Sequence, residues 1–209
     1  SIFICEEEKI NTKISVIITN YNYGQYIDQS IESVKNQTFK DYELIIIDDC
    51  SSDKFTQDKI KEISKDKSIK LIQNKKNKGV CFSRNLATNQ AKGKYILYLD
   101  ADDYLYNDCL MKMYNKIQYD YDIIGSGYKE IGTGKTLFRK KFDKLSFCHG
   151  CELSVTSLFK KSLWEKSGGF RENMEGGFED YDFWLRLIGN GALIFNIKEP
   201  LFYFRNKEV

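Results

Sequence analysis

Short apolar runs alternate with amphipathic segments along the first half of the chain. The apolar runs are rich in Ile, Leu and Val, as buried strands are; they are Ser15–Thr19 with Ile14, Leu44–Ile47, Ile69–Ile72 and Lys94–Leu99. The segments between them repeat apolar residues at helical spacing; they are Tyr26–Gln37, a Lys-rich stretch around Ile60 and Ile63, and Gly79–Ala91. This alternation predicts an α/β fold, a single Rossmann-like α/β/α sandwich with a mainly parallel central sheet.

The second half of the chain is less regular, but it contains no linker, internal repeat or low-complexity tract. Its predicted elements are a helix at Asp108–Tyr119, a strand at Ile123–Lys129, a strand running into a helix at Ser154–Trp164, a helix at Glu179–Ile188, and strands at Ala192–Ile197 and Leu201–Phe204 around Pro200. The whole chain is therefore expected to form one domain.

Three polar segments follow predicted parallel strands, and topology brings them together. Right-handed crossovers place the loops that follow parallel strands at one edge of the sheet, where ligands bind. We therefore expect Thr19–Tyr23, Asp48–Asp53 and Asp100–Asp103 to converge in one crevice.

The acidic cluster Asp100-Ala101-Asp102-Asp103 lies where a buried strand meets solvent. Three carboxylates so close together repel one another unless a cation lies between them. Hard oxygen ligands suit Mg²⁺ or Mn²⁺, which commonly complete their coordination with substrate phosphates. An acidic loop or a helix cap is the alternative, and the expected proximity of Asp48 and Asp49 favours the metal site.

Composition and charge narrow the class of protein. The chain has 209 residues and a net charge of +2, which does not favour a nucleic-acid partner. Nine Lys lie between Lys54 and Lys78, either on a solvated helix face or on a patch that contacts an anionic membrane surface. No apolar run is long enough to span a bilayer and no signal peptide is evident, so we expect a cytoplasmic location, with peripheral membrane contact as the variant.

The six cysteines do not form a disulfide pattern, and we expect reduced thiols. Cys148-His149-Gly150-Cys151 suggests zinc, but a structural zinc site needs four ligands and no second Cys/His pair is present.

Several ordered motifs resemble glycosyltransferase family 2. The motifs are Ile14–Asn22 (ISVIITNYN), Glu43–Asp53 (ELIIIDDCSSD), Asn77-Lys-Gly79 followed by Ser83-Arg84-Asn85, Asp100–Asp103 (DADD), Gly168-Gly169-Phe170 and Glu179–Arg186 (EDYDFWLR). Their order and spacing resemble the family from Lys13 to Arg205. The resemblance implies a GT-A fold and divides the chain into an N-terminal extension (1–12), a nucleotide-sugar-binding half (13–104) and an acceptor-binding half (105–209).

The resemblance also implies an inverting glycosyltransferase that moves a sugar from a nucleotide-diphosphate donor, with UDP favoured. The acceptor would be a hydroxyl of a glycan or lipid-linked glycan in bacterial surface-polysaccharide synthesis. On the donor side it implies a nucleotide pocket, a ribose contact and a metal ligand. These roles fall on Thr19 and Tyr21 beside the nucleoside, Asp49 accepting a hydrogen bond from the base, Arg84 near the donor, Asp100 near ribose and metal, and Asp102 on Mn²⁺ or Mg²⁺.

Asp180 is implied as the general base, because an inverting transfer needs one carboxylate to take the proton of the acceptor hydroxyl. Asp103 and Glu179 are expected to support the acceptor side. His149, the only histidine, is expected to be an acceptor-side or structural residue.

Two other functions stay open at this stage. A phosphatase of the haloacid-dehalogenase type would use the Asp100/Asp102 pair, although it favours Thr or Val where this chain has Tyr104. A catalytically retired nucleotide-sugar-binding partner subunit is predicted to lack the metal carboxylate or the base, yet Asp102 and Asp180 are both present. Oligomeric state also stays open, with a homodimer as one option.

Overall fold

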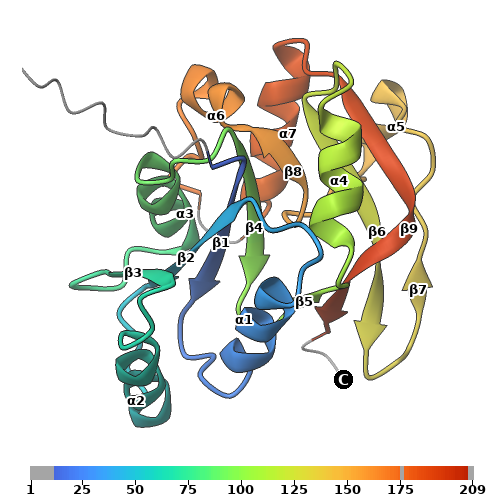
Figure 1. The fold of residues 1–209 in the computed structure, drawn as a ribbon. Helices are drawn as coiled ribbons and strands as arrows, with labels where there is room; N and C mark the ends of the chain where they lie inside the picture. Colours follow the sequence, from blue (N-terminus) through green and yellow to red (C-terminus); the bar gives the residue numbers. More distant parts are fainter. Residues whose placement is uncertain (1–11, 175–176, 207–209) are drawn as a thin grey trace, which may run out of the picture.

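A computed structural model describes residues 12–174 and 177–206 (Figure 1). The expected N-terminal extension lies outside the described residues except for Thr12. Along the chain the elements are β1 (Ile14–Asn20), α1 (Ile27–Lys35), β2 (Tyr42–Asp48), α2 (Lys54–Ile63), β3 (Ile69–Gln73), α3 (Val80–Asn89), β4 (Tyr95–Asp100), β5 (Tyr104–Leu105), α4 (Cys109–Ile117), β6 (Ile123–Ile131), β7 (Thr136–Leu137), α5 (Lys144–His149), β8 (Leu158–Lys160), α6 (Lys161–Ser167), α7 (Glu179–Gly189) and β9 (Ile194–Arg205).

One sheet runs through the described residues in the order β3-β2-β1-β4-β8-β6-β9-β5, with β7 paired to β6. The four strands of the first half are parallel, as predicted, and β6 and β9 are parallel too. Strand β8 runs antiparallel to both β4 and β6 and so joins the two parallel groups. The sheet is therefore mainly parallel, and the predicted fold class is confirmed.

Alternation of apolar side chains along the central strands produces two cores, one on each face of the sheet. In β1, Val16 and Ile18 pack on one face, while Ile17 packs on the other. The first face is covered by α1, α2 and α4, and the second by α3 and α7 together with α5 (Figure 1). Because the central strands are buried on both faces, they appear in the sequence as continuous apolar runs.

The structure differs from the predicted elements mainly in the second half. The two strands predicted around Pro200 form the single strand β9, whose pairing with β6 shifts register on both sides of Gly127. This irregularity accommodates Pro200, which has no N–H to donate to the ladder. The short elements β5, β7 and α5 were not predicted, because two-residue strands and a single-turn helix carry almost no periodicity.

The lysine-rich segment is a solvated helix face over part of its length. In α2, Lys54 and Lys61 pair with Asp58, and Lys59 pairs with Asp28 and Glu62. These ion pairs offset part of the positive charge that would otherwise face a membrane. No helix among the described residues is both long and apolar enough to cross a bilayer.

Gly93, just before β4, lies against the backbone of β1. Its N–H donates to Ser15 Oγ at 2.9 Å, and a Cβ on Gly93 would lie 2.5 Å from the backbone nitrogen of Ser15. Because strand backbone cannot yield easily, we expect Gly93→Ala to lower the free energy of unfolding by about 1–3 kcal/mol in urea titrations. Gly150→Ala is the matched control, since no atom lies within 4 Å of its added Cβ, and equal losses for the two variants would contradict this account.

Candidate active site

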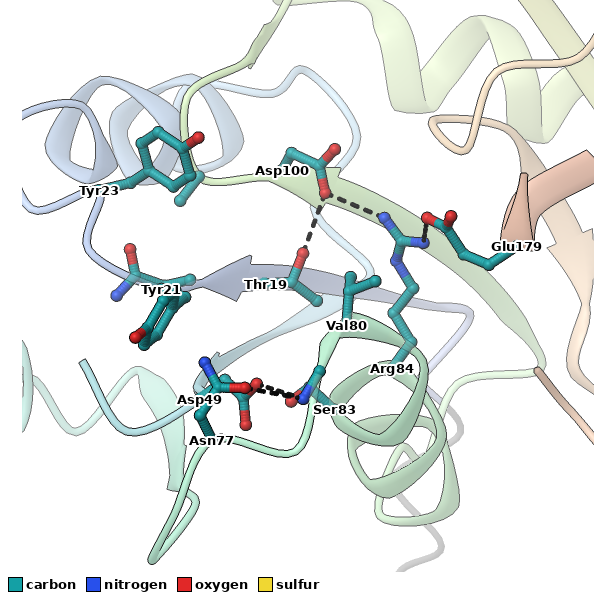
Figure 2. A pocket seen from close by; sticks show the side chains of 13 residues that line it. Thr19, Tyr21, Tyr23, Asp49, Asn77, Val80, Ser83, Arg84, Asp100 and Glu179 are labelled. Carbon is teal, nitrogen blue, oxygen red and sulfur yellow. Dashed lines mark hydrogen bonds and ion pairs between the residues drawn. The ribbon is translucent and has the colours of Figure 1, made fainter. Parts of the chain in front are cut away.

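A cavity of about 320 Å³ opens at the carboxyl ends of β1, β2 and β4 (Figure 2). Its lining comes from the three loops that were expected to converge, together with the start of α3 and of α7. Its members are Thr19, Asn20, Tyr21, Tyr23, Asp49, Asn77, Gly79, Val80, Ser83, Arg84, Asp100, Ala101 and Glu179. The expected convergence is therefore confirmed, and five segments of the sequence meet at this cavity.

Strand register positions the centre of the cavity. Thr19 and Asp100 lie opposite each other at the ends of the neighbouring parallel strands β1 and β4. Thr19 Oγ1 donates a hydrogen bond to Asp100 Oδ1 at 3.0 Å. Tyr21 follows in the loop and is 39% exposed, so its ring is available to stack on a planar ligand. The three residues thus form one wall with both polar and aromatic groups.

Asp48 and Asp49 have different tasks although they are neighbours. Asp48 accepts hydrogen bonds from Asn20 Nδ2 at 2.6 Å and from the Ser51 backbone N–H at 3.0 Å, so it fixes its own turn. Asp49 accepts from the backbone N–H groups of Lys78 at 2.9 Å and Gly79 at 2.7 Å. Asp49 therefore holds the loop that leads into α3 against the cavity.

Arg84 joins the two halves of the chain. From α3, its guanidinium donates to Asp100 Oδ1 at 3.1 Å and to Glu179 Oε1 at 3.0 Å (Figure 2). The arginine is 2% exposed, and its Cζ lies 5.7 Å from the Tyr98 ring and 5.4 Å from the Phe170 ring. Two carboxylates and two aromatic rings thus hold this side chain in one position.

The two carboxylates keep Arg84 charged although it is buried. Burial disfavours the charged guanidinium, but the charges of Asp100 and Glu179 outweigh burial and raise the pKa of Arg84. Reciprocally, the guanidinium offsets the charge of both carboxylates. This ionic bridge of Asp100, Arg84 and Glu179 borders the cavity at the side of α7.

A second cavity, of about 300 Å³, lies on the other side of the ionic bridge. It shares Arg84, Asp100 and Glu179 with the first cavity and adds Asp180. Its remaining lining comes from the acidic loop after β4, from β6, the segment after β7, the segment before β8, and β9; the members are Asp103, Tyr128, Arg139, Cys151, Leu153, Ser154, Val155, Thr156, Phe202 and Phe204. The two cavities therefore meet at a charged boundary, with Asp180 on the second side only.

Asp180 is partly buried at the start of α7. Burial raises the pKa of its carboxyl, and the charge of Glu179 raises it further. The Tyr181 backbone N–H, which donates to Asp180 Oδ1 at 2.7 Å, and the more distant Arg84 act in the opposite direction. A carboxylate with a raised pKa at a cavity wall is a suitable proton acceptor near neutral pH.

The rest of the acidic cluster is buried. Asp102 and Asp103 are each 4% exposed, and Arg205 bonds to the backbone oxygen of Asp102 and to Asp103 Oδ1. Asp103 lines the second cavity, whereas Asp102 lines neither. Within residues 12–174 and 177–206, no three His, Cys, Asp or Glu side chains gather into a metal site.

His149 is apart from the other site residues. It is exposed at the end of α5 and is not among the described residues that line the two cavities. The neighbouring Cys148 and Cys151 are free thiols. Arg139 and Thr156 line the second cavity although no sequence motif marked them, because only the pairing of β6 with β9 and β8 brings their segments together.

Comparison with known proteins identifies what the chain is similar to. The model described as Glycosyl transferase family 2 matches residues 15–186. A glycosyltransferase of Methanocaldococcus jannaschii is 34% identical over 92% of this chain and 70% of its own length. The poly(ribitol-phosphate) beta-N-acetylglucosaminyltransferase TarP of Staphylococcus aureus is 32% identical over 92% of this chain and 62% of TarP.

The structural comparison agrees. The crystal structure of S. aureus TarS 1–349 in complex with UDP-GlcNAc superposes with a TM-score of 0.80 and 26% sequence identity. The match covers 94% of this chain and 59% of that one. This chain thus spans less than two thirds of TarP and of the solved TarS chain.

Proposed function

The chain belongs to glycosyltransferase family 2, and from this premise we propose that it is an inverting glycosyltransferase that uses a UDP-sugar donor. The first cavity takes the nucleotide, and we call it the donor cavity. The second cavity takes the hydroxyl of a glycan or lipid-linked glycan acceptor, and we call it the acceptor cavity. The UDP-GlcNAc complex of TarS supports the choice of UDP. The observation that carries the proposal is the charged boundary between the cavities, with the Asp180 carboxylate in the second cavity and not in the first.

The donor residues support this division of the site. The exposed ring of Tyr21 is suited to stack on the base, with Thr19 beside the nucleoside. Asp49 lines the same cavity, and its carboxylate is oriented by the Lys78 and Gly79 N–H groups. It accepts the N3–H of uracil in our proposal, and this hydrogen bond favours uracil over cytosine, which has no proton at N3.

Asp180 is the general base in this proposal. Its ionised carboxylate takes the proton of the acceptor hydroxyl as that oxygen attacks the anomeric carbon. The bond from the anomeric carbon to the diphosphate breaks on the opposite face, which inverts the configuration. Arg84 offsets the charges of Asp100 and Glu179, so the base acts beside a partly neutralised boundary.

In this proposal the acidic loop binds a divalent cation together with the diphosphate of the donor. Asp100 is partly exposed at both cavities, so its carboxylate supplies hard oxygen ligands. Asp102, two residues later, is buried and lines neither cavity, so it would reach the cation only after a shift of the loop. A bound Mn²⁺ or Mg²⁺ would neutralise charge that develops on the departing diphosphate. Asp102 is the proposed ligand, with Asp100 beside it and Asp103 supporting the loop.

We expect Mn²⁺ to bind weakly to the free protein and at least tenfold more tightly in the presence of UDP. The reason is that the described residues provide no three-ligand site, so diphosphate oxygens must complete the coordination. Calorimetric titration of Mn²⁺ with and without UDP measures this coupling, and Asp102→Asn should abolish it. An Mn²⁺ affinity that ignores UDP would contradict the metal assignment.

A donor panel tests the activity itself. The protein is incubated with Mn²⁺ and a series of UDP-, GDP- and TDP-sugars, and donor hydrolysis is followed with and without glycan acceptors. Turnover with a UDP-sugar supports the proposal. Failure with every donor, together with UDP binding that is indifferent to Mn²⁺, would instead support a nucleotide-sugar-binding subunit without activity.

The proposed setting is the inner face of a bacterial membrane, where lipid-linked glycans are assembled. The lysine-rich segment Lys54–Lys78 is the proposed point of peripheral contact. A vesicle-sedimentation assay with and without anionic lipid measures this contact, and equal sedimentation in both would contradict it.

A further inference from the structure

Arg139 is an arginine of the acceptor cavity without a carboxylate partner. The segment after β7 carries it, and its backbone N–H donates to the Lys198 carbonyl. The side chain is half-buried, and its Nε donates to the Ser126 carbonyl at 3.3 Å. Arg84, Arg171 and Arg186 each form an ion pair, but within the described part of the chain no ion pair includes Arg139.

The neighbours of Arg139 do not supply a countercharge. Its Cζ lies 6.0 Å from the ring of Tyr128, and burial lowers the pKa of its guanidinium. Burial also raises the pKa of the nearby Cys151 thiol to about 11, so this group is neutral near pH 7. Glu152 influences Arg139 only at a distance. A partly buried guanidinium without a partner is costly unless an anion binds to it.

Thr156 provides an independent indication in the same cavity. It is 1% exposed, and its Oγ1 has no hydrogen-bond partner among the described groups. A buried hydroxyl without a partner costs free energy. Because this hydroxyl has almost no accessible surface, a ligand oxygen would recover that cost after a small shift of the cavity wall. Ser154 lines the same wall, and its hydroxyl has only a long hydrogen bond of 3.4 Å, to the Thr156 carbonyl.

We infer that Arg139 and Thr156 form an anion subsite in the acceptor cavity, and that the acceptor carries a phosphodiester or carboxylate near the hydroxyl that receives the sugar. The inference rests on the proposed function, since it assigns the second cavity to the acceptor. Four acids also line this cavity: Arg84 offsets the charges of Asp100 and Glu179, and Asp103 accepts a hydrogen bond from the Arg205 backbone N–H. The remaining acid is Asp180, so the anion of the acceptor must bind on the Arg139 side, away from Asp180. A planar guanidinium and a hydroxyl are the donors that recognise oxyanions.

Binding of three short oligomers to the UDP-loaded protein tests the subsite. The probes are a glycerol-phosphate oligomer, a galacturonate oligomer and a neutral galactose oligomer, titrated calorimetrically. We expect the protein to prefer at least one anionic oligomer over the neutral one. Arg139→Gln should weaken that binding roughly 10- to 100-fold, because it removes a charged hydrogen bond, and Arg139→Lys should restore part of it. Thr156→Val keeps the shape and should weaken it by a smaller factor.

Lys140→Gln is the matched control, since it removes the same charge from the adjacent exposed residue. We expect Lys140→Gln to leave all three oligomer affinities and the hydrolysis of the UDP-sugar unchanged, and we expect UDP to bind to both variants, since neither residue lines the first cavity. The inference is overturned if the anionic oligomers bind no better than the neutral one, or if Arg139→Gln and Lys140→Gln have equal effects. If the unmodified protein neither binds UDP nor hydrolyses a UDP-sugar, the proposed function is overturned instead.

Discussion

Replacing Asp180 with Asn is expected to lower kcat for sugar transfer by roughly 10²- to 10⁴-fold, the range that a positioned general base contributes. Asn has nearly the same shape but cannot take a proton from the acceptor hydroxyl. Because Asp180 lines the proposed acceptor cavity and not the proposed donor cavity, the affinity for UDP should change less than twofold. Initial rates and UDP titrations of the same preparation measure both quantities.

The pH dependence provides a second test of Asp180. As the proposed base, Asp180 works when it is ionised, and its pKa in the folded protein is raised above the ordinary value of 3.8. Activity should therefore fall as the pH drops through this raised pKa, and the acidic limb should disappear in Asp180→Asn. Asp182→Asn is the matched control on the same helix, because Asp182 forms ion pairs with Arg171 and Arg186 and lines neither cavity. Weaker UDP binding by Asp180→Asn would count against its role as base.

Replacing Arg84 with Gln should produce the largest loss of stability among single changes at the site. The substitution leaves Asp100 and Glu179 without their partner, and losing one member of a buried ion pair costs about 3–5 kcal/mol. The two carboxylates are 37% and 20% exposed and regain some hydration, so we expect about 3 kcal/mol. For a chain of this size that loss lowers Tm by roughly 6–12 °C in thermal unfolding.

Two further variants distinguish the effect of losing the ionic bridge from the effect of losing a positive charge. Arg171→Gln removes an arginine that is 60% exposed and paired with Asp182, so it should cost less than about 1 kcal/mol. Arg84→Lys should recover only part of the loss, because an ammonium lacks the planar fork that reaches two carboxylates and stacks on Tyr98 and Phe170. Equal Tm values for Arg84→Gln and Arg171→Gln would contradict the structural importance of the bridge.

Local pattern was sufficient for the first half of the fold. The apolar runs of β1, β2 and β4 are buried on both faces over most of their length, so their composition alone distinguishes them from the amphipathic helices. Parallel strands and right-handed crossovers then dictate that the loops after them share one edge. The sequence therefore predicts that Thr19, Asp49 and Asp100 lie together, and the first cavity contains all three.

The second half depended on pairing that has no local signal. Strand β8 has three residues and inserts between β4 and β6, and β9 returns along β6 with shifted register. These contacts join segments far apart in the chain, and they form the second cavity. For this reason no sequence motif marks Arg139 and Thr156. The sequence also has no local signal for the exposed position of His149.

The sequence by itself determined the α/β class, the family and the loops that form the donor side, because periodicity and motif spacing are local properties. Only the tertiary structure decided how the carboxylates are divided between the two cavities. Asp100 and Glu179 are 79 residues apart, and burial of Arg84 between them creates the boundary that leaves Asp180 on the other side. Charge, burial and distance act together there, and these depend on how helices α3 and α7 pack against the sheet.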